Sequence, residues 1–166
     1  MQVLSGTGLA GLVERLVANE LPNGRGIGAW RSLLRAHATL MRQLETDLEQ
    51  QTGLALADFD VLAQLAIADG EVRMTELANR ALISRSGMTR RVARLVDEGL
   101  VRRADIGADG RGVVVALTDA GVARLAETVP AHARGIAKYF VSRLDDQELA
   151  VLESALGKVT VDCTFG

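Results

Sequence analysis

The chain has 166 residues, of which 48% are hydrophobic and only 3% aromatic, and its formal net charge is −2. This composition excludes an intrinsically disordered protein and allows one domain with a core built mainly from Leu, Val and Ala. The single cysteine, Cys163, excludes an internal disulfide, and no segment has the apolar run of a signal peptide or a transmembrane helix. We therefore expect a cytoplasmic protein with no bound metal or other cofactor.

Three helices are predicted in the first 70 residues. Apolar residues recur at helical spacing in residues 6–20, from Trp30 to Leu48, and again in residues 55–70. Pro22 and the glycines that follow it separate the first two helices, and Gly53 ends the second. The second helix is about six turns long, and its single apolar face is typical of a helix that packs against a partner helix.

A short helix, a tight turn and a longer helix are predicted next. Thr75 is a candidate N-cap for the short helix, and "SRS" at Ser84–Ser86 breaks it. The longer helix is predicted for residues 86–98 and should end at Gly99, because glycine readily takes the left-handed conformation that closes a helix.

Two strands and two further helices complete the chain. Residues 100–104 and 112–117 are predicted to pair across a turn rich in Gly and Asp. Thr118 is predicted to cap the long helix that follows, and a last helix is expected to carry an apolar stripe ending at Val159. This order predicts a mostly α-helical fold: a winged helix-turn-helix with a small wing of two or three strands, flanked by long helices.

The arginines of the chain are unevenly distributed. Residues 73–111 contain nine arginines and five acidic residues, a net charge of +4, whereas the rest of the chain has a net charge of −6. Every basic residue of this segment is arginine, which pairs well with phosphates and with guanine edges. A solvated helix surface is one explanation; a basic face that contacts a polyanion is the other.

The helix predicted for residues 86–98 has two different faces. Met88, Val92, Leu95 and Val96 gather on one side and would seat the helix on its own domain. Small and polar residues lie on the other side, with Arg90 and Arg94 one turn apart, where they could reach phosphates or base edges. The predicted DNA contacts of this region are Ser84, Arg85, Ser86, Thr89, Arg90 and Arg94.

The tip of the predicted hairpin supports the same interpretation. Arg111 lies in the glycine-rich sequence "GADGRG", where it could enter a minor groove, and Asp109 could orient it. An arginine-bearing helix followed by an arginine-tipped hairpin indicates DNA binding more strongly than either feature alone.

The sequence "MTELANRALISRSGMTRRVARLVDEGLVRR", followed by "DGRGVVVALTDAG", resembles the MarR family of bacterial multiple-antibiotic-resistance regulators. The most specific parts are Val96–Arg103, Asp109–Arg111 and Leu117–Gly121. Family members often have Asp-Arg-Arg in the wing, and here Gly110 replaces the first Arg, so only Arg111 is expected to keep the minor-groove role.

The resemblance implies a homodimer that binds a pseudo-palindromic operator on double-stranded DNA, usually as a repressor that a small-molecule effector releases. The resemblance implies four domains. These are an N-terminal extension with a short helix (1–26), a dimerisation helix (27–54), the DNA-binding lobe (55–118) and C-terminal dimerisation helices (119–166).

Trp30, His37 and Asp60 are candidates for an effector pocket. Trp30 offers a stacking surface, and an aspartate in an otherwise apolar helix is costly unless it is satisfied. Some relatives that bind aromatic anions have an added N-terminal helix and a Trp in the first long helix, so an aromatic anion is one candidate effector. We favour the simpler interpretation, in which Trp30 and His37 belong to the dimer core and Asp60 faces solvent.

Two other classes of protein remain as alternatives. A winged-helix module that binds protein and not DNA would have the same fold, although the basic face argues against it. An enzyme is not expected, because the chain has two histidines that are distant in sequence, His37 and His132, and no recognisable catalytic motif.

Overall fold

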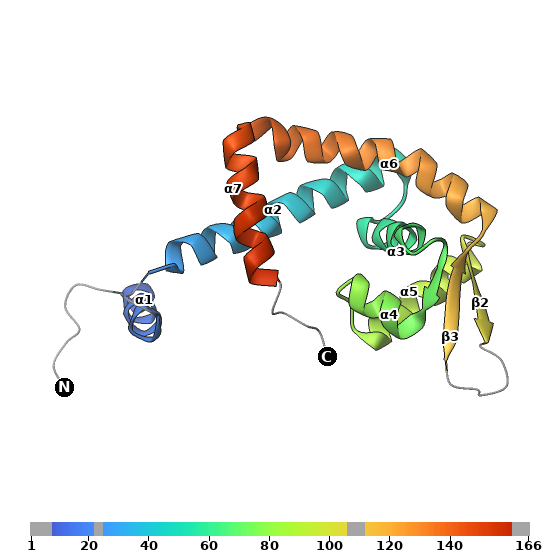
Figure 1. The fold of residues 1–166 in the computed structure, drawn as a ribbon, viewed down its shortest axis with the longest axis horizontal. Helices are drawn as coiled ribbons and strands as arrows, with labels where there is room; N and C mark the ends of the chain where they lie inside the picture. Colours follow the sequence, from blue (N-terminus) through green and yellow to red (C-terminus); the bar gives the residue numbers. More distant parts are fainter. Residues whose placement is uncertain (1–7, 22–24, 106–111, 161–166) are drawn as a thin grey trace. The chain divides into compact units, whose positions relative to one another are not determined.

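The computed structural model describes residues 8–21, 25–105 and 112–160 (Figure 1). The chain divides into two compact units, Met1–Arg42 and Gln43–Gly166. The boundary between them falls within the long second helix, so the units differ from the four domains implied by the resemblance, and those domains stay a prediction. Among the described residues, no helix is long and apolar enough to cross a membrane.

The first unit contains helix α1, Leu9–Glu20, and the first part of helix α2, Ile27–Thr52. Both helices have large apolar side chains that remain exposed within the chain. Leu16 is 57% exposed on α1, and Trp30 and Leu34 are 55% and 48% exposed on α2. The apolar stripes predicted from the sequence are therefore present, but this unit does not bury them.

In its described residues, the second unit holds the end of α2, five further α-helices, a 3-10 helix and three strands. The further helical elements are α3 (Leu56–Ile67), α4 (Met74–Arg80), α5 (Arg85–Asp97), α6 (Asp119–Tyr139), η2 (Val141–Arg143) and α7 (Asp146–Thr160). The strands are β1 (Glu71–Arg73), β2 (Val101–Asp105) and β3 (Val113–Leu117).

The three strands form one antiparallel sheet in the order β1-β3-β2. Val115 of β3 pairs with Val72 of β1 on one side and with Arg103 of β2 on the other. The sequence left two or three strands open and did not locate β1, because three residues are too few to display the alternation that identifies a strand. The mostly helical fold with a small wing confirms the predicted fold class.

We call the elements from α3 to β3, residues 56–117, the lobe. The core of the lobe lies where α3, α4, α5 and the sheet meet. Its fully buried side chains are Val61, Leu62, Leu65, Leu77, Met88, Val92, Leu95 and Val115. Each such aliphatic side chain contributes about 1.5–3 kcal/mol when it is removed from water. Of the four residues predicted to seat the helix of residues 86–98, α5 buries Met88, Val92 and Leu95. The prediction for Val96 is wrong, because this side chain is 37% exposed.

Local signals in the sequence place the ends of these elements. The hydroxyl of Thr118 accepts a hydrogen bond from the Gly121 amide at 3.0 Å and caps α6 as predicted. Gly99 follows α5 with a φ of +73°, in the conformation that glycine favours. The prediction that Thr75 caps α4 is wrong, because the helix already begins at Met74 and Arg73 occupies its N-cap position.

Candidate DNA interface

Helices α4 and α5 form the helix-turn-helix. The turn between them ends at Ser84, whose hydroxyl accepts a hydrogen bond from the Gly87 amide at 3.2 Å and caps α5. Leu82 in this turn has a φ of +54° and is 67% exposed. The Ser84 hydroxyl thus satisfies one of the amides that the end of α5 leaves without a helical partner, which is a structural role in the turn.

The first half of α5 presents its polar side chains to solvent. Arg85, Ser86, Thr89 and Arg90 are all exposed. The Thr89 hydroxyl donates to the Arg85 carbonyl at 2.9 Å, and among the described residues none forms an ion pair or a hydrogen bond with the Arg90 side chain. Arg85 and Arg90 both lie on this face, and no acid among the described residues forms an ion pair with either guanidinium.

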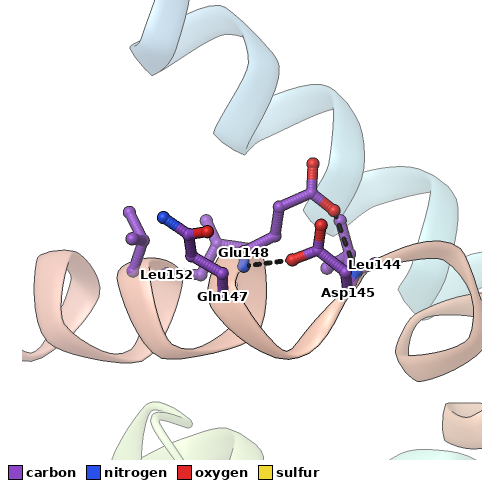
Figure 2. Close-up of a pocket in the computed structure, with 6 residues that line it drawn as sticks. Leu144, Asp145, Gln147, Glu148 and Leu152 are labelled. Carbon is purple, nitrogen blue, oxygen red and sulfur yellow. Dashed lines mark hydrogen bonds between the residues drawn. The ribbon is translucent and has the colours of Figure 1, made fainter.

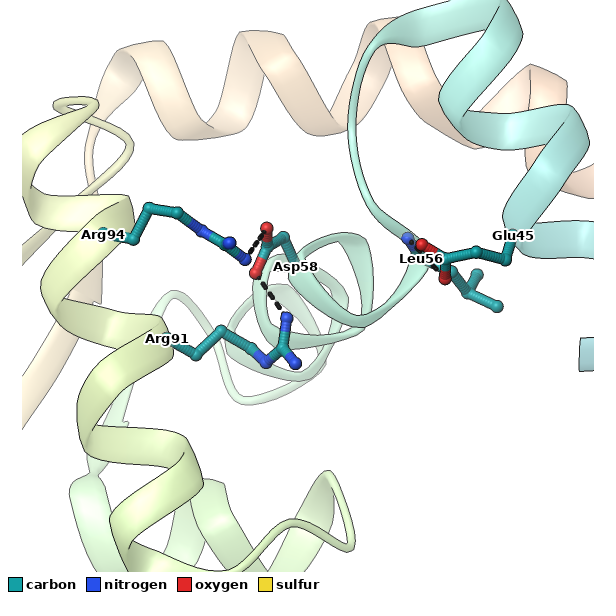
Figure 3. A network of polar contacts seen from close by, with 5 residues as sticks. All are labelled: Glu45, Leu56, Asp58, Arg91 and Arg94. Carbon is teal, nitrogen blue, oxygen red and sulfur yellow. Dashed lines mark hydrogen bonds and ion pairs between the residues drawn. The ribbon is translucent and has the colours of Figure 1, made fainter. Parts of the chain in front are cut away.

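The second half of α5 is held by a carboxylate that sequence reasoning missed. Asp58, in the first turn of α3, has a side chain that is only 5% exposed, and its two oxygens each accept from one arginine of α5 (Figure 3). Arg91 Nη1 lies 2.8 Å from Asp58 Oδ1, and Arg94 Nη2 pairs with Asp58 Oδ2. One buried carboxylate thus joins two guanidinium groups of the helix.

The two arginines of this pair of contacts differ in exposure. The side chain of Arg91 is 27% exposed, and that of Arg94 is 53% exposed. The hydrogen bond and the charge of Asp58 raise the pKa of Arg94. Arg94 was expected to face outward; it is half exposed, and Figure 3 shows it directed toward Asp58.

The signal for Asp58 in the sequence is weak. An acid in the first turn of a helix interacts favourably with the helix dipole, which explains Asp58 without any partner. An aspartate in an apolar helix is costly unless it is satisfied, and α3 has two of them. Asp60, the candidate named from the sequence, lies on the exposed side of α3, whereas Asp58 is buried.

A second contact ties α5 to the wing. Arg103 of β2 donates through Nη2 to the Thr89 carbonyl at 3.1 Å. Strands β2 and β3 support the hairpin, but Arg111 and Asp109, the residues predicted at its tip, lie outside the described residues.

The three candidate effector residues belong to different units. Trp30 and His37 are exposed on the part of α2 that lies in the first unit, and Asp60 is exposed on α3 in the second. Partial burial of its carboxyl raises the pKa of Asp60, and the charges of His132 and Arg91 lower it by less.

His132 of α6 lies close to α3 and was not predicted to be part of any site. Its ring centroid is 4.5 Å from that of Phe59, with the planes tilted by 42°. Burial lowers the pKa of the imidazole, and the charge of Asp60 offsets this in part. Nδ1 of His132 is buried and has no hydrogen-bond partner among the described residues.

A surface hollow of about 430 Å³ lies at the start of α7 (Figure 2). Its two acids are already engaged: the Asp145 carboxylate accepts from the Glu148 amide at 2.8 Å, and Glu148 accepts from the Asp145 amide at 3.0 Å. These reciprocal bonds form a capping box, which explains both acids as helix-end residues.

Comparison with known proteins places this geometry in a family. The model of the MarR family matches residues 52–112. The DNA complex of Sco3205, a MarR family transcriptional regulator from Streptomyces coelicolor, is 34% identical, with 80% of this chain and 86% of that chain covered and a TM-score of 0.74. AbsC, a MarR family transcriptional regulator from the same organism, is 31% identical, with 80% and 89% covered and a TM-score of 0.73.

A curated relative agrees with these structures. The HTH-type transcriptional regulator PecS of Dickeya dadantii is 32% identical over 108 residues, which are 64% of each chain. These relatives are regulators and not enzymes. The chain belongs to the MarR family of winged-helix transcriptional regulators.

Proposed function

We propose that the chain is a cytoplasmic, sequence-specific DNA-binding regulator that acts as a homodimer. The observation that carries this proposal is the construction of α5. Its apolar side is fixed in the lobe by Met88, Val92 and Leu95, while Arg90 and its neighbours in the first half of the helix are exposed. A rigid helix with an exposed polar face is the element that winged-helix proteins insert into the major groove.

The proposed contacts follow from the position of each group on α5. Arg90, with no partner among the described residues, is the candidate for a base contact, since a bidentate arginine discriminates guanine by about 1–3 kcal/mol. Arg85, Ser86 and Thr89 are candidates for phosphate contacts near the helix N-terminus. Arg111, oriented by Asp109, is proposed to enter the adjacent minor groove.

The homodimer is supported by apolar side chains that the chain leaves exposed. No residue of α7 is buried, and Val151 and Val159 are each 60% exposed. Two copies related by a two-fold axis would bury such faces against each other and present two copies of α5 to the half-sites of a pseudo-palindromic operator.

Repression and effector control rest on the family resemblance. We propose that the dimer blocks transcription when it is bound to its operator and that a small molecule modulates this binding. An aromatic anion is the first class of effector to test. The expected result is that the anion weakens operator binding and raises the melting temperature of the free protein.

The direct test of the proposed function uses the DNA upstream of the protein's own gene. The affinity of the full chain for this duplex should fall steeply between two salt concentrations, because each neutralised phosphate releases counterions. An affinity that is the same at both salt concentrations would contradict the phosphate contacts. No duplex binding at low salt, together with retained binding of a protein partner, would favour the interaction module instead.

A further inference from the structure

Asp58 holds an unusual position for a carboxylate. It is a buried charged residue on α3, and both of its oxygens are used by arginines of the helix proposed to contact DNA. Burying a carboxylate is unfavourable unless its charge is paired and its oxygens accept hydrogen bonds. Asp58 meets both conditions only through α5, so its contacts depend on the placement of that helix.

The contacts give Arg91 and Arg94 different roles. Arg91 is mostly enclosed and joins α5 to α3. Arg94 is half exposed, so part of its guanidinium can still contact DNA while Asp58 holds the other part. Arg94 also lines, with Gly87, Arg90 and Arg91, a surface hollow of about 200 Å³ on α5. Asp58 therefore acts on the same face that Arg90 occupies.

The shared carboxylate also changes the charge of this face. Arg91, Arg94 and Asp58 together carry a net charge of +1, where two free arginines would carry +2. A long, unrestrained arginine can contact any phosphate, whereas one held at a fixed angle contacts only groups that lie where it points. Neutralisation and fixed direction both favour selective over general binding of DNA.

We propose that Asp58 is a positioning residue for DNA recognition, which directs Arg94 on α5 and limits the attraction of this face to non-specific DNA. This inference rests on the proposed function, that α5 contacts DNA. It predicts that removal of the Asp58 charge strengthens binding to unrelated sequences and weakens discrimination.

The experiment compares the full-length protein with Asp58→Asn, a substitution of nearly equal shape. Binding to the upstream duplex and to a scrambled duplex of equal length is measured at several salt concentrations. For the scrambled duplex, the Asp58→Asn variant should show a slope of log affinity against log salt that is steeper by about 0.9, one additional phosphate contact. The ratio of specific to non-specific affinity should fall about tenfold.

The matched control is Glu76→Gln on α4. Glu76 pairs with Arg80 at 2.6 Å, so this variant also frees an arginine, but one that is not on α5. It should keep the wild-type affinity ratio. Thermal unfolding of each variant shows that folded molecules are being compared.

A second variant keeps the proposal testable if Asp58→Asn does not fold. Arg94→Gln leaves the contact of Asp58 with Arg91 in place and should lower the affinity ratio, whereas Arg143→Gln on η2 should not. Wild-type slope and ratio in Asp58→Asn, or a wild-type ratio in Arg94→Gln, would overturn the role of Asp58. Failure of the unmodified protein to discriminate the two duplexes would instead contradict the proposed function itself.

Discussion

Helices α5 and α7 are similar in length and both carry apolar side chains, but only α5 buries them within the chain. Met88, Val92 and Leu95 of α5 are fully buried, whereas no residue of α7 is buried and Val151 and Val159 are largely exposed. The apolar side of α5 is covered by its own lobe, so its polar side is held in a fixed direction. The apolar side of α7 is left available for another surface.

This contrast separates two kinds of amphipathic helix that look alike in sequence. A helix whose apolar side is satisfied within the lobe can present a ligand-binding face. A helix whose apolar side is unsatisfied is typical of an interface. Mutations on the apolar side of α5 should therefore destabilise the lobe, whereas mutations on the apolar side of α7 should dissociate the dimer.

The largest effect is expected from a cavity in the lobe core. Leu95→Ala should lower the free energy of unfolding by about 2–5 kcal/mol, because Leu95 is fully buried and the surrounding helices cannot close the space completely. Urea denaturation followed by circular dichroism measures this. A loss below about 0.5 kcal/mol would show that α5 is not seated as described.

The corresponding test on α7 concerns assembly. Leu156→Ser combined with Val159→Ser should dissociate the proposed homodimer, since each side chain removed from an apolar interface forfeits about 1.5–3 kcal/mol. Analytical ultracentrifugation should then report a monomer whose circular dichroism is unchanged. A dimer that persists in this variant would remove α7 from the interface.

A smaller effect is expected from the cap that starts α5. Ser84→Ala removes the acceptor for the Gly87 amide and should destabilise the lobe by about 1 kcal/mol. Thr75→Ala is the control, because Thr75 is exposed in the first turn of α4 and does not cap that helix. Equal stability of the two variants would mean that the cap contributes nothing.

The packing of α6 against the lobe can be tested by the pH dependence of the free energy of unfolding. Burial lowers the pKa of His132, so the folded protein binds fewer protons there than the unfolded chain. Its contribution to stability should be complete above the ordinary value of 6.5 and be lost as pH falls below it. Between about pH 7.5 and pH 5.5, the unmodified protein should lose more stability than His132→Gln.

The controls for this pH dependence concern Asp60, the charged group that faces His132. The pKa of Asp60 is raised, so the folded protein binds more protons there than the unfolded chain, and the effect on stability has the opposite sign. Its contribution to stability is complete at low pH and is lost as pH rises from 3.8 through the pKa of Asp60 in the folded protein. Asp60→Asn should therefore make the loss of stability on acidification larger. Identical pH profiles in the unmodified protein and His132→Gln would refute the role of His132.

Much of the lobe could be predicted because its signals are local. The apolar side of α5, the Thr118 cap and the glycine after α5 each depend on residues within a few positions of one another. Strand β1 could not, because its three residues pair with β3, more than 40 positions away along the chain.

The polar network of the site was also beyond local reasoning. Asp58 meets Arg91 and Arg94 across 33 and 36 positions, and each residue has a sufficient local explanation by itself. The arginines fit a DNA-facing helix surface, and the aspartate fits a helix N-terminus. Only the packing of α5 against α3 shows that these charges compensate one another.

The central claim, that the exposed face of α5 contacts bases, is tested most directly by Arg90→Ala. We predict that this variant lowers the discrimination between the upstream duplex and a scrambled duplex by about 1–3 kcal/mol, while its stability is unchanged. Arg143→Ala, the same loss of charge on η2, should keep the full discrimination. Equal discrimination in both variants and in the unmodified protein would contradict a base contact by Arg90.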